Sequence, residues 1–364
     1  MLRIFLVILL VLHGSIHVMG FLKSLNPDSI SQLKQSISSG QGIAWLITAI
    51  IFLVATALAL LHNEYWWILA WIAMVLSQFL IIQSWADARF GTIANILILF
   101  AVIIGFSQWR FAATFREDVK DLLQTSNINN TLTEQDIRSL PEPVKKYIRY
   151  TGHLGKNKTN TFKAAFEGQI RSSEKSAWMN FKASQYSMID TPSRYFFIKA
   201  YMKGIPVDGY HRFKNGKATM DIRAASLVRV QFAQGREMDI AETVTYFNDM
   251  CILAPGSLTN SSITWKEIRD NEVDATFTNK SITIHATLQF NDKGELVNFI
   301  SDDRYFNAAT KQMQKLRWMT PVSGYKETDG IRFPTFGEAI WVLPEGNFTY
   351  AKMNINSVRI NPGQ

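Results

Sequence analysis

The chain has 364 residues, of which 47% are hydrophobic, and a formal net charge of +8 at pH 7. This length is enough for two domains of ordinary size. The excess of positive charge lies mostly beyond residue 110, where the basic residues are scattered and no run of Lys or Arg resembles a nucleic-acid-binding arm. We therefore expect no nucleic-acid partner, and a mildly basic surface suited to anionic lipid headgroups.

Four apolar stretches occupy the first 110 residues, which we interpret as a four-span transmembrane unit. Each is close to the ~20 residues that cross a hydrocarbon core as a helix, and together they cover residues 2–22, 43–61, 65–83 and 92–109. The first stretch has no small-residue cleavage site and three more spans follow it, so it is predicted to be a retained helix. In the first loop, Ile30, Leu33 and Ile37 recur at helical spacing and predict a short amphipathic helix in the headgroup region.

Four spans place both ends of the membrane unit on one side of the bilayer. The flanking positive charges favour the side of the termini by one residue: Arg3, Arg110, Arg116 and Lys120 against Lys23, Lys34 and Arg89. By the positive-inside rule this margin favours a cytoplasmic soluble domain. We expect a multi-pass protein of the bacterial inner membrane, with membrane lipids as partners; the sequence leaves the oligomeric state open.

Residues 111–140 are interpreted as an exit helix followed by an Asn-rich linker, and residues 141–364 as a soluble domain. From residue 160 the apolar period changes from 3.6 to 2, as in "SITIHATLQF", which predicts strands with one buried face. Asn215 and Gly216 predict a two-residue hairpin of type I′. We expect nine or ten antiparallel strands and one helix near residues 237–253, which presents Ile240, Val244 and Phe247 on one stripe.

The predicted fold class is therefore α+β: a four-helix transmembrane unit followed by a largely antiparallel sheet that forms an incomplete barrel packed against a helix. Cys251 is the only cysteine in the chain, which excludes an internal disulfide. Its apolar neighbours Met250 and Ile252 predict a buried structural thiol.

Several segments of the second half resemble, in order, an uncharacterised bacterial family catalogued as a domain of unknown function. They include "ETVTYFNDMCILAPGSL", "LQFNDKGELVNFISDDRYF", "RWMTPVSGY" and "GIRFPTFGEAIWVLPEGNFTY". The resemblance covers about residues 140–360, and the four-span part looks like the membrane unit of some members. The order of strands and helix is also similar, by topology alone, to the lipoprotein-carrier half-barrel. That likeness implies a sheet around a helix that can hold acyl chains.

The segment "HGSIHVMGF" places His13 and His17 four residues apart on one face of the first span. Burying an unpaired imidazole in a bilayer costs several kcal/mol, so the pair must find partners inside the bundle. The polar candidates on the other spans are Thr48, Thr56, Ser77, Gln78, Asn95 and Ser107. Neutral imidazoles bonded to neighbouring helices are one interpretation, and ligation of a haem or metal, or a proton or quinone site, are others.

The soluble half contains polar groups that could support acid–base chemistry. Asp208 and His211 lie in one segment, and Asp302, Asp303 and Arg304 lie in another. Glu338 is a further carboxylate of this half. Motifs of nucleophile elbows, phosphate-binding loops and zinc sites are absent from the sequence, so we predict no catalytic residue, metal or cofactor.

Three functions remain open from the sequence. The first is binding of a lipid or other apolar small molecule in the β domain, with Ile240, Val244 and Phe247 as the ligand-facing residues of the helix. The second is an envelope enzyme that uses the Asp208–His211 and Asp302–Arg304 segments. The third is a membrane assembly or sensor protein in which the His13/His17 pair is the working part.

Overall fold

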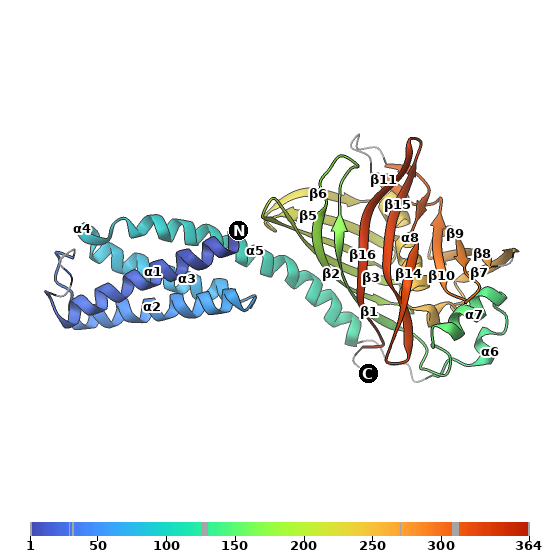
Figure 1. Cartoon of the computed structure of the whole chain (residues 1–364), viewed down its shortest axis with the longest axis horizontal. Coiled ribbons are helices and arrows are strands. Elements are labelled where there is room, and N and C mark those ends of the chain that lie inside the picture. Colours follow the sequence, from blue (N-terminus) through green and yellow to red (C-terminus); the bar gives the residue numbers. More distant parts are fainter. Residues whose placement is uncertain are drawn as a thin grey trace. The chain divides into compact units, whose positions relative to one another are not determined.

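A computed structural model gives the fold, and it describes residues 2–28, 30, 33–124, 130–269, 271–307 and 313–362. Two compact units emerge (Figure 1): one contains the chain as far as Ala113, and the other contains nearly everything from Thr114 onward. Most of the predicted Asn-rich linker, residues 125–129, lies outside the described residues.

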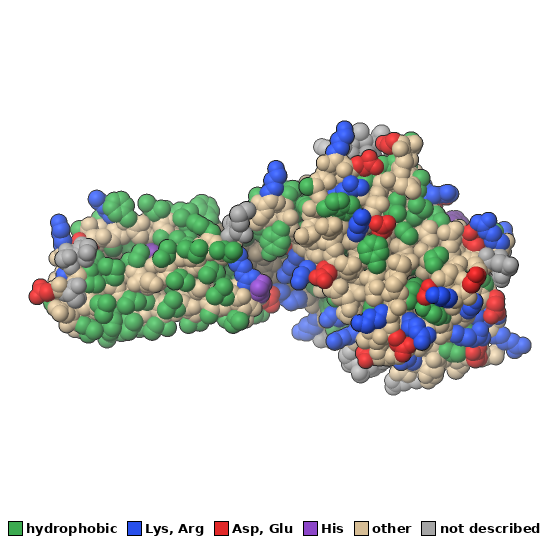
Figure 2. Space-filling view, viewed as in Figure 1, with side chains coloured by type: hydrophobic (Ala, Val, Ile, Leu, Met, Phe, Trp, Pro, Cys, Tyr) green, Lys and Arg blue, Asp and Glu red, His purple; other side chains and the backbone are tan. Residues whose placement is uncertain are grey.

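The first unit consists of long apolar helices. Its elements are α1 (Leu2–Leu25), α2 (Ser39–Leu60), α3 (Trp66–Gln83), the short α4 (Trp85–Ala88) and α5 (Gly91–Gln124). Four of these helices are long and apolar enough to cross a membrane. Large apolar side chains such as Ile4, Phe79 and Phe100 point outward and are more than half exposed, and hydrophobic side chains are spread along the visible face of this unit (Figure 2). Apolar exteriors of this kind are stable against lipid.

Hydrogen bonds define the two ends of this bundle. At one end Arg3 binds the carbonyls of Ala59 and Leu60, so the start of α1 lies beside the turn between α2 and α3. At the other end Gln35 donates its N–H to Asp87, so the α1–α2 loop lies beside α4. The described residues of that loop, which include Ile30, Leu33 and Ile37, form no helix, and the predicted amphipathic helix was wrong.

The second unit contains three more α-helices, a 3₁₀ turn and sixteen strands among the described residues. The helical elements are α6 (Glu134–Ile137), α7 (Glu142–Tyr150), α8 (Arg236–Leu253) and η1 (Pro255–Ser257). The strands are β1 (Thr161–Ile170), β2 (Met179–Met188), β3 (Ser193–Met202), β4 (Ile205–Lys214), β5 (Lys217–Ala224), β6 (Val228–Gln234), β7 (Ile263–Arg269), β8 (Glu272–Asn279), β9 (Ile282–Phe290), β10 (Leu296–Ser301), β11 (Tyr305–Asn307), β12 (Met313–Lys315), β13 (Trp318–Met319), β14 (Val322–Thr328), β15 (Ile331–Leu343) and β16 (Gly346–Ile360).

Nearly all of these strands join one antiparallel sheet, in the order β6-β5-β4-β3-β2-β1-β16-β15-β13-β10-β9-β8-β7 with β14 added beside β15. In the described part of the chain its two edges, β6 and β7, do not pair, so the sheet is an incomplete barrel as predicted. The strand number exceeds the expected nine or ten. Short elements such as β13 carry too few residues for a period of two, and β6 is exposed at six of its seven residues.

Helix α8 lies against the concave face of this sheet (Figure 1), and nearly all of its residues are buried. Its Phe247 ring stacks on Phe277 of β8 with 5.0 Å between centroids and meets Phe299 of β10 edge-on. The Tyr246 hydroxyl donates to the Met188 carbonyl at the end of β2. Cys251 on the same helix is fully buried, as predicted from its apolar neighbours.

The hairpin between β4 and β5 confirms the turn predicted from Asn215-Gly216. Lys214 pairs with Lys217, which leaves two residues in the turn. Asn215 has φ 57° and Gly216 has φ 72°, both in the left-handed region that a type I′ turn requires. A Cβ atom on Gly216 would also lie 3.3 Å from the Lys280 side chain.

Replacing Gly216 by valine is expected to destabilise the protein by about 1–2 kcal/mol, because a β-branched residue is strained at positive φ. Thermal unfolding of the full-length protein in detergent measures the effect. Asn215→Gly is the matched control, since glycine adopts φ 57° without strain. Equal melting temperatures for Gly216→Val and the wild type would contradict this account of the turn.

Candidate functional site

A cavity of about 220 Å³ lies between the concave face of the sheet and α8. It is bounded by strands β1 to β5 and β13 to β16 on one side and by one face of α8 on the other. Most of its wall is apolar, contributed by side chains such as Phe166, Phe181, Phe196, Ile198, Ile252 and Ile355. An apolar wall of this kind can pack against an apolar ligand.

The cavity opens towards one end of the strands. Ile170 at the end of β1 pairs with Met179 at the start of β2, and Val207 lies near the start of β4. These lining residues and Ile198 are only half-buried, whereas Phe166 and Ala351 deeper in the cavity are buried. Half-exposed apolar side chains around an opening form a mouth through which an apolar chain can enter.

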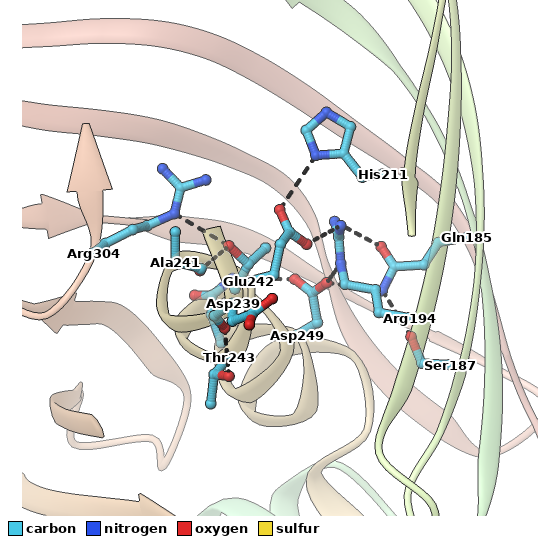
Figure 3. A network of polar contacts seen from close by, with 12 residues as sticks. Gln185, Ser187, Arg194, His211, Asp239, Ala241, Glu242, Thr243, Asp249 and Arg304 are labelled. Atoms are coloured by element: carbon cyan, nitrogen blue, oxygen red, sulfur yellow. Dashed lines mark hydrogen bonds and ion pairs between the residues drawn. The ribbon is translucent and has the colours of Figure 1, made fainter. Parts of the chain in front are cut away.

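A buried polar cluster joins β3 to α8 at the wall of the cavity (Figure 3). Arg194 donates from Nε to Asp249 Oδ2 over 2.7 Å and from Nη1 to Glu242 Oε2 over 3.1 Å. Gln185 on β2 donates to the same Asp249 oxygen at 2.8 Å, and His211 Nδ1 lies 3.3 Å from Glu242 Oε1. One guanidinium therefore binds two carboxylates that lie two turns apart on one helix.

The charged side chains of this cluster stabilise one another by direct contact. Burial alone would raise the pKa of Glu242, but the Arg194 charge and the His211 hydrogen bond lower it to about 2. The carboxylate of Glu242 is thus ionised at neutral pH and engaged by its partners. A carboxylate held in this state favours a structural role over proton transfer.

A second guanidinium, that of Arg304, lines the cavity from the segment between β10 and β11. Its Nε donates to Thr245 Oγ1 on α8 at 3.1 Å. The guanidinium carbon lies 4.4 Å from the ring centroid of Trp318 and 4.9 Å from that of Trp341. The two arginines approach the polar face of α8 from opposite sides (Figure 3).

Ile240, Val244 and Phe247, named from the sequence as ligand-facing, lie on a different stripe of α8. Val244 and Phe247 are fully buried in the hydrophobic core, and Ile240 packs against that core half-buried. The residues of α8 that line the cavity are Glu242, Thr245, Asn248, Asp249, Ile252 and Leu253. On that other stripe Phe247 contacts Phe277 of β8 and Phe299 of β10. The role of the three residues in binding stays a prediction.

The polar groups of the enzyme hypothesis do not converge. His211 lines the cavity, but Asp208 lies three residues away on the same strand and therefore on its other face. Asp302 is ion-paired with Arg317 on the surface, and Asp303 accepts hydrogen bonds from His285 and Lys315. Arg304 of the second segment lines the cavity, and so does Glu338 on β15.

In the helical unit His13 and His17 are buried, at 3% and 1% exposure. His13 Nε2 lies 3.0 Å from Ser77 Oγ and 2.9 Å from Asn95 Oδ1, two of the partners named from the sequence. His17 Nδ1 donates to the His13 carbonyl, so its Nε2 carries the lone pair, and this atom has no partner among the described residues. Within those residues no group of three or more His, Cys, Asp or Glu could hold a metal ion.

Sequence reasoning named His211 but missed the other members of the polar cluster, which are Gln185, Arg194, Glu242 and Asp249. Glu242 and Asp249 are seven residues apart with Thr245 between them, which places three polar side chains on one face of the helix. That pattern was a usable signal for α8. No pattern in the sequence marked Arg194 as buried, because a single arginine in a strand is usually exposed.

The chain belongs to the family of unknown function DUF6544, whose model matches residues 130–353. The matched range contains α8, both arginines and every residue of the cavity lining except Ile355. No curated protein matches the chain.

Solved structures with some likeness include a putative outer membrane lipoprotein-sorting protein domain from Vibrio parahaemolyticus, with 8% identity over 56% of this chain and 87% of that one and a TM-score of 0.36. A LolA superfamily protein from Nitrosomonas europaea has 11% identity over 60% and 91%, with a TM-score of 0.36. A DUF1329 family protein from Desulfovibrio piger has 11% identity over 65% and 95%, with a TM-score of 0.32. Likeness at this level carries no information about a ligand or an activity.

Replacing Arg194 by methionine is expected to destabilise the protein by about 3–5 kcal/mol at pH 8, because two buried carboxylates lose their cation. The difference from the wild type should shrink at pH 5. In the wild type the lowered pKa of Glu242 gives stability that is present above its ordinary pKa of 4.5 and is lost as the pH falls towards 2. Without Arg194, burial raises the pKa of Glu242. The carboxylate of the variant is therefore protonated at a higher pH than that of the wild type, and the cost of its buried charge falls at pH 5.

The measurement is the thermal unfolding of full-length protein at both pH values. Arg317→Met is the matched control, since this exposed arginine pairs with Asp302 at the surface and its loss should cost less than about 1 kcal/mol. If Arg194→Met melted like Arg317→Met at pH 8, the cluster would not be holding α8 in place.

Proposed function

We propose that this member of the DUF6544 family is a membrane-anchored protein that binds a lipid or another apolar ligand in the cavity between its sheet and α8. The observation that carries the proposal is the cavity itself, with a volume of about 220 Å³, a mostly apolar wall and a mouth of half-exposed apolar residues. Close-packed interiors rarely leave such a space.

The size of the cavity suits one acyl chain or part of one. It is smaller than the about 300–1,000 Å³ of sites for drug-sized molecules, and larger than the ~150 Å³ engineered cavity that binds benzene. Each methylene group removed from water contributes about 0.8 kcal/mol. A short stretch of chain in this cavity would therefore give measurable affinity.

The helical unit supports the same function. Its four long apolar helices would keep the β domain on the membrane that supplies lipids. We place the protein in the bacterial inner membrane as a multi-pass protein. By the margin of one positive charge, the soluble domain is assigned to the cytoplasmic side.

The ligand should be visible by native mass spectrometry of the full-length protein released from lipid nanodiscs. We expect the wild type to retain one acyl-bearing molecule. Ile198→Trp should lower the retained fraction several-fold, because Ile198 is half-buried at the mouth and an indole there would fill the entrance.

Ile268→Trp provides the matched control, since Ile268 on β7 is 47% exposed and lies outside the lining. Both variants should melt close to the wild type, which separates a blocked cavity from a damaged fold. A wild-type protein without any retained apolar molecule, or equal retention in the two tryptophan variants, would contradict the proposal.

The membrane topology is tested with single cysteines at Asn63, in the α2–α3 turn, and at Ser36, in the α1–α2 loop. Ser38 is avoided because its side chain caps α2. An impermeant maleimide applied to intact cells and to inverted vesicles should label the two positions from opposite sides. The native Cys251 is buried and adds little background. Labelling of both positions from the same side would refute the four-span arrangement.

A further inference from the structure

We propose that Arg304 binds the anionic headgroup, a carboxylate or phosphate oxygen, of an amphiphile whose apolar chain occupies the cavity. The inference rests on the proposed function and narrows its ligand class from apolar molecules in general to acyl or alkyl chains that end in an anion.

The position of Arg304 is fixed by three contacts. Its Nε donates to Thr245 Oγ1 at 3.1 Å, and the Thr245 hydroxyl itself donates to the Ala241 carbonyl, so it is oriented to accept. The flat guanidinium lies over the rings of Trp318 and Trp341, at 4.4 and 4.9 Å from their centroids. Stacking fixes the plane of the group and leaves its outer N–H edge available.

That edge has no anionic partner in the described part of the chain. The adjacent carboxylates are used elsewhere: Asp302 pairs with Arg317, and Asp303 pairs with Lys315 and His285. Glu242 interacts with Arg304 only through space, while its oxygens bind Arg194 and His211. The terminal nitrogens Nη1 and Nη2 therefore keep donors in the geometry that binds a carboxylate or phosphate in a bidentate manner.

Arg194 differs from Arg304 in how its donors are used. It lies in the same cavity, but its nitrogens donate to Asp249, Glu242 and Gln185. Each of its three nitrogens donates to a protein group. The cavity thus contains one arginine that is fully used in holding α8 and one that is held in place by a hydroxyl and two aromatic rings.

An anion at Arg304 also fits the shape of the cavity. Apolar side chains such as Ile198 and Phe166 line the same cavity as Arg304, so one molecule in the cavity would pack its alkyl chain against that wall and place its charged end at Arg304. A ligand without an anion would leave the N–H edge unpaired and gain less. Fatty acids and monoalkyl phosphates share the required chemistry.

The test uses full-length protein in nanodiscs and three photoactivatable probes with the same diazirine-bearing chain: a fatty acid, the matching fatty alcohol and the matching monoalkyl phosphate. At pH 8 we expect the wild type to be cross-linked by the acid or the phosphate about tenfold more than by the alcohol, the effect of one charged hydrogen-bonded pair. Whichever anion labels more strongly identifies the headgroup.

Arg304→Gln should reduce this ratio to about one while labelling by the alcohol persists. Arg304→Lys should retain an intermediate ratio, because lysine keeps the charge but lacks the planar group that donates two parallel hydrogen bonds. The matched control is Arg317→Gln, which removes one positive charge from an exposed site nearby and should keep the wild-type ratio.

The outcomes separate the two proposals. Equal labelling of the wild type by acid, phosphate and alcohol would overturn the role of Arg304 and leave apolar binding intact. Absence of labelling by every probe would overturn the proposed function. A fall of the ratio in Arg317→Gln as large as in Arg304→Gln would assign the preference to general surface charge, and would also overturn the inference.

Discussion

The contact of Arg194 with Glu242 and Asp249 determines how far α8 lies from the part of the sheet that bounds the cavity. On its other side the helix packs directly on β8 and β10 through Phe247. On the cavity side the long side chain of Arg194 lies between α8 and β3. Buried ion pairs add little net stability compared with apolar packing, but they fix one arrangement. Arg194 thus joins helix and sheet at the wall of the cavity, through a side chain that lies between them.

Much of the fold follows from local signals in the sequence. The four apolar stretches, the strand alternation of residues 282–290 and the Asn215-Gly216 turn each depend on residues close together in the chain, and the structure contains all three features. Errors arose where the local signal was short or ambiguous. The stripe of Ile30, Leu33 and Ile37 forms no helix in the described residues, and strands as short as β13 show no periodicity.

The site was much less predictable, because it depends on which of two faces each element turns inward. The apolar periodicity of α8 identifies Val244 and Phe247 as buried, but it does not distinguish a stripe that packs in the core from one that lines a cavity. Asp208 and His211 looked like partners in sequence, but strand alternation separates them. Arg194 meets its carboxylates from 48 and 55 residues away, a pairing that no local pattern specifies.

The reactivity of the single buried thiol measures how often α8 separates from its surroundings. Cys251 lies on α8 within the core that the helix shares with the sheet, and burial raises the pKa of its thiol well above the ordinary value. Because only the thiolate reacts readily, modification of the native chain must wait until α8 separates from its surroundings. The reaction rate then reports how often α8 opens. A ligand that binds only the closed state would slow the reaction by a factor of one plus the ratio of its concentration to its dissociation constant.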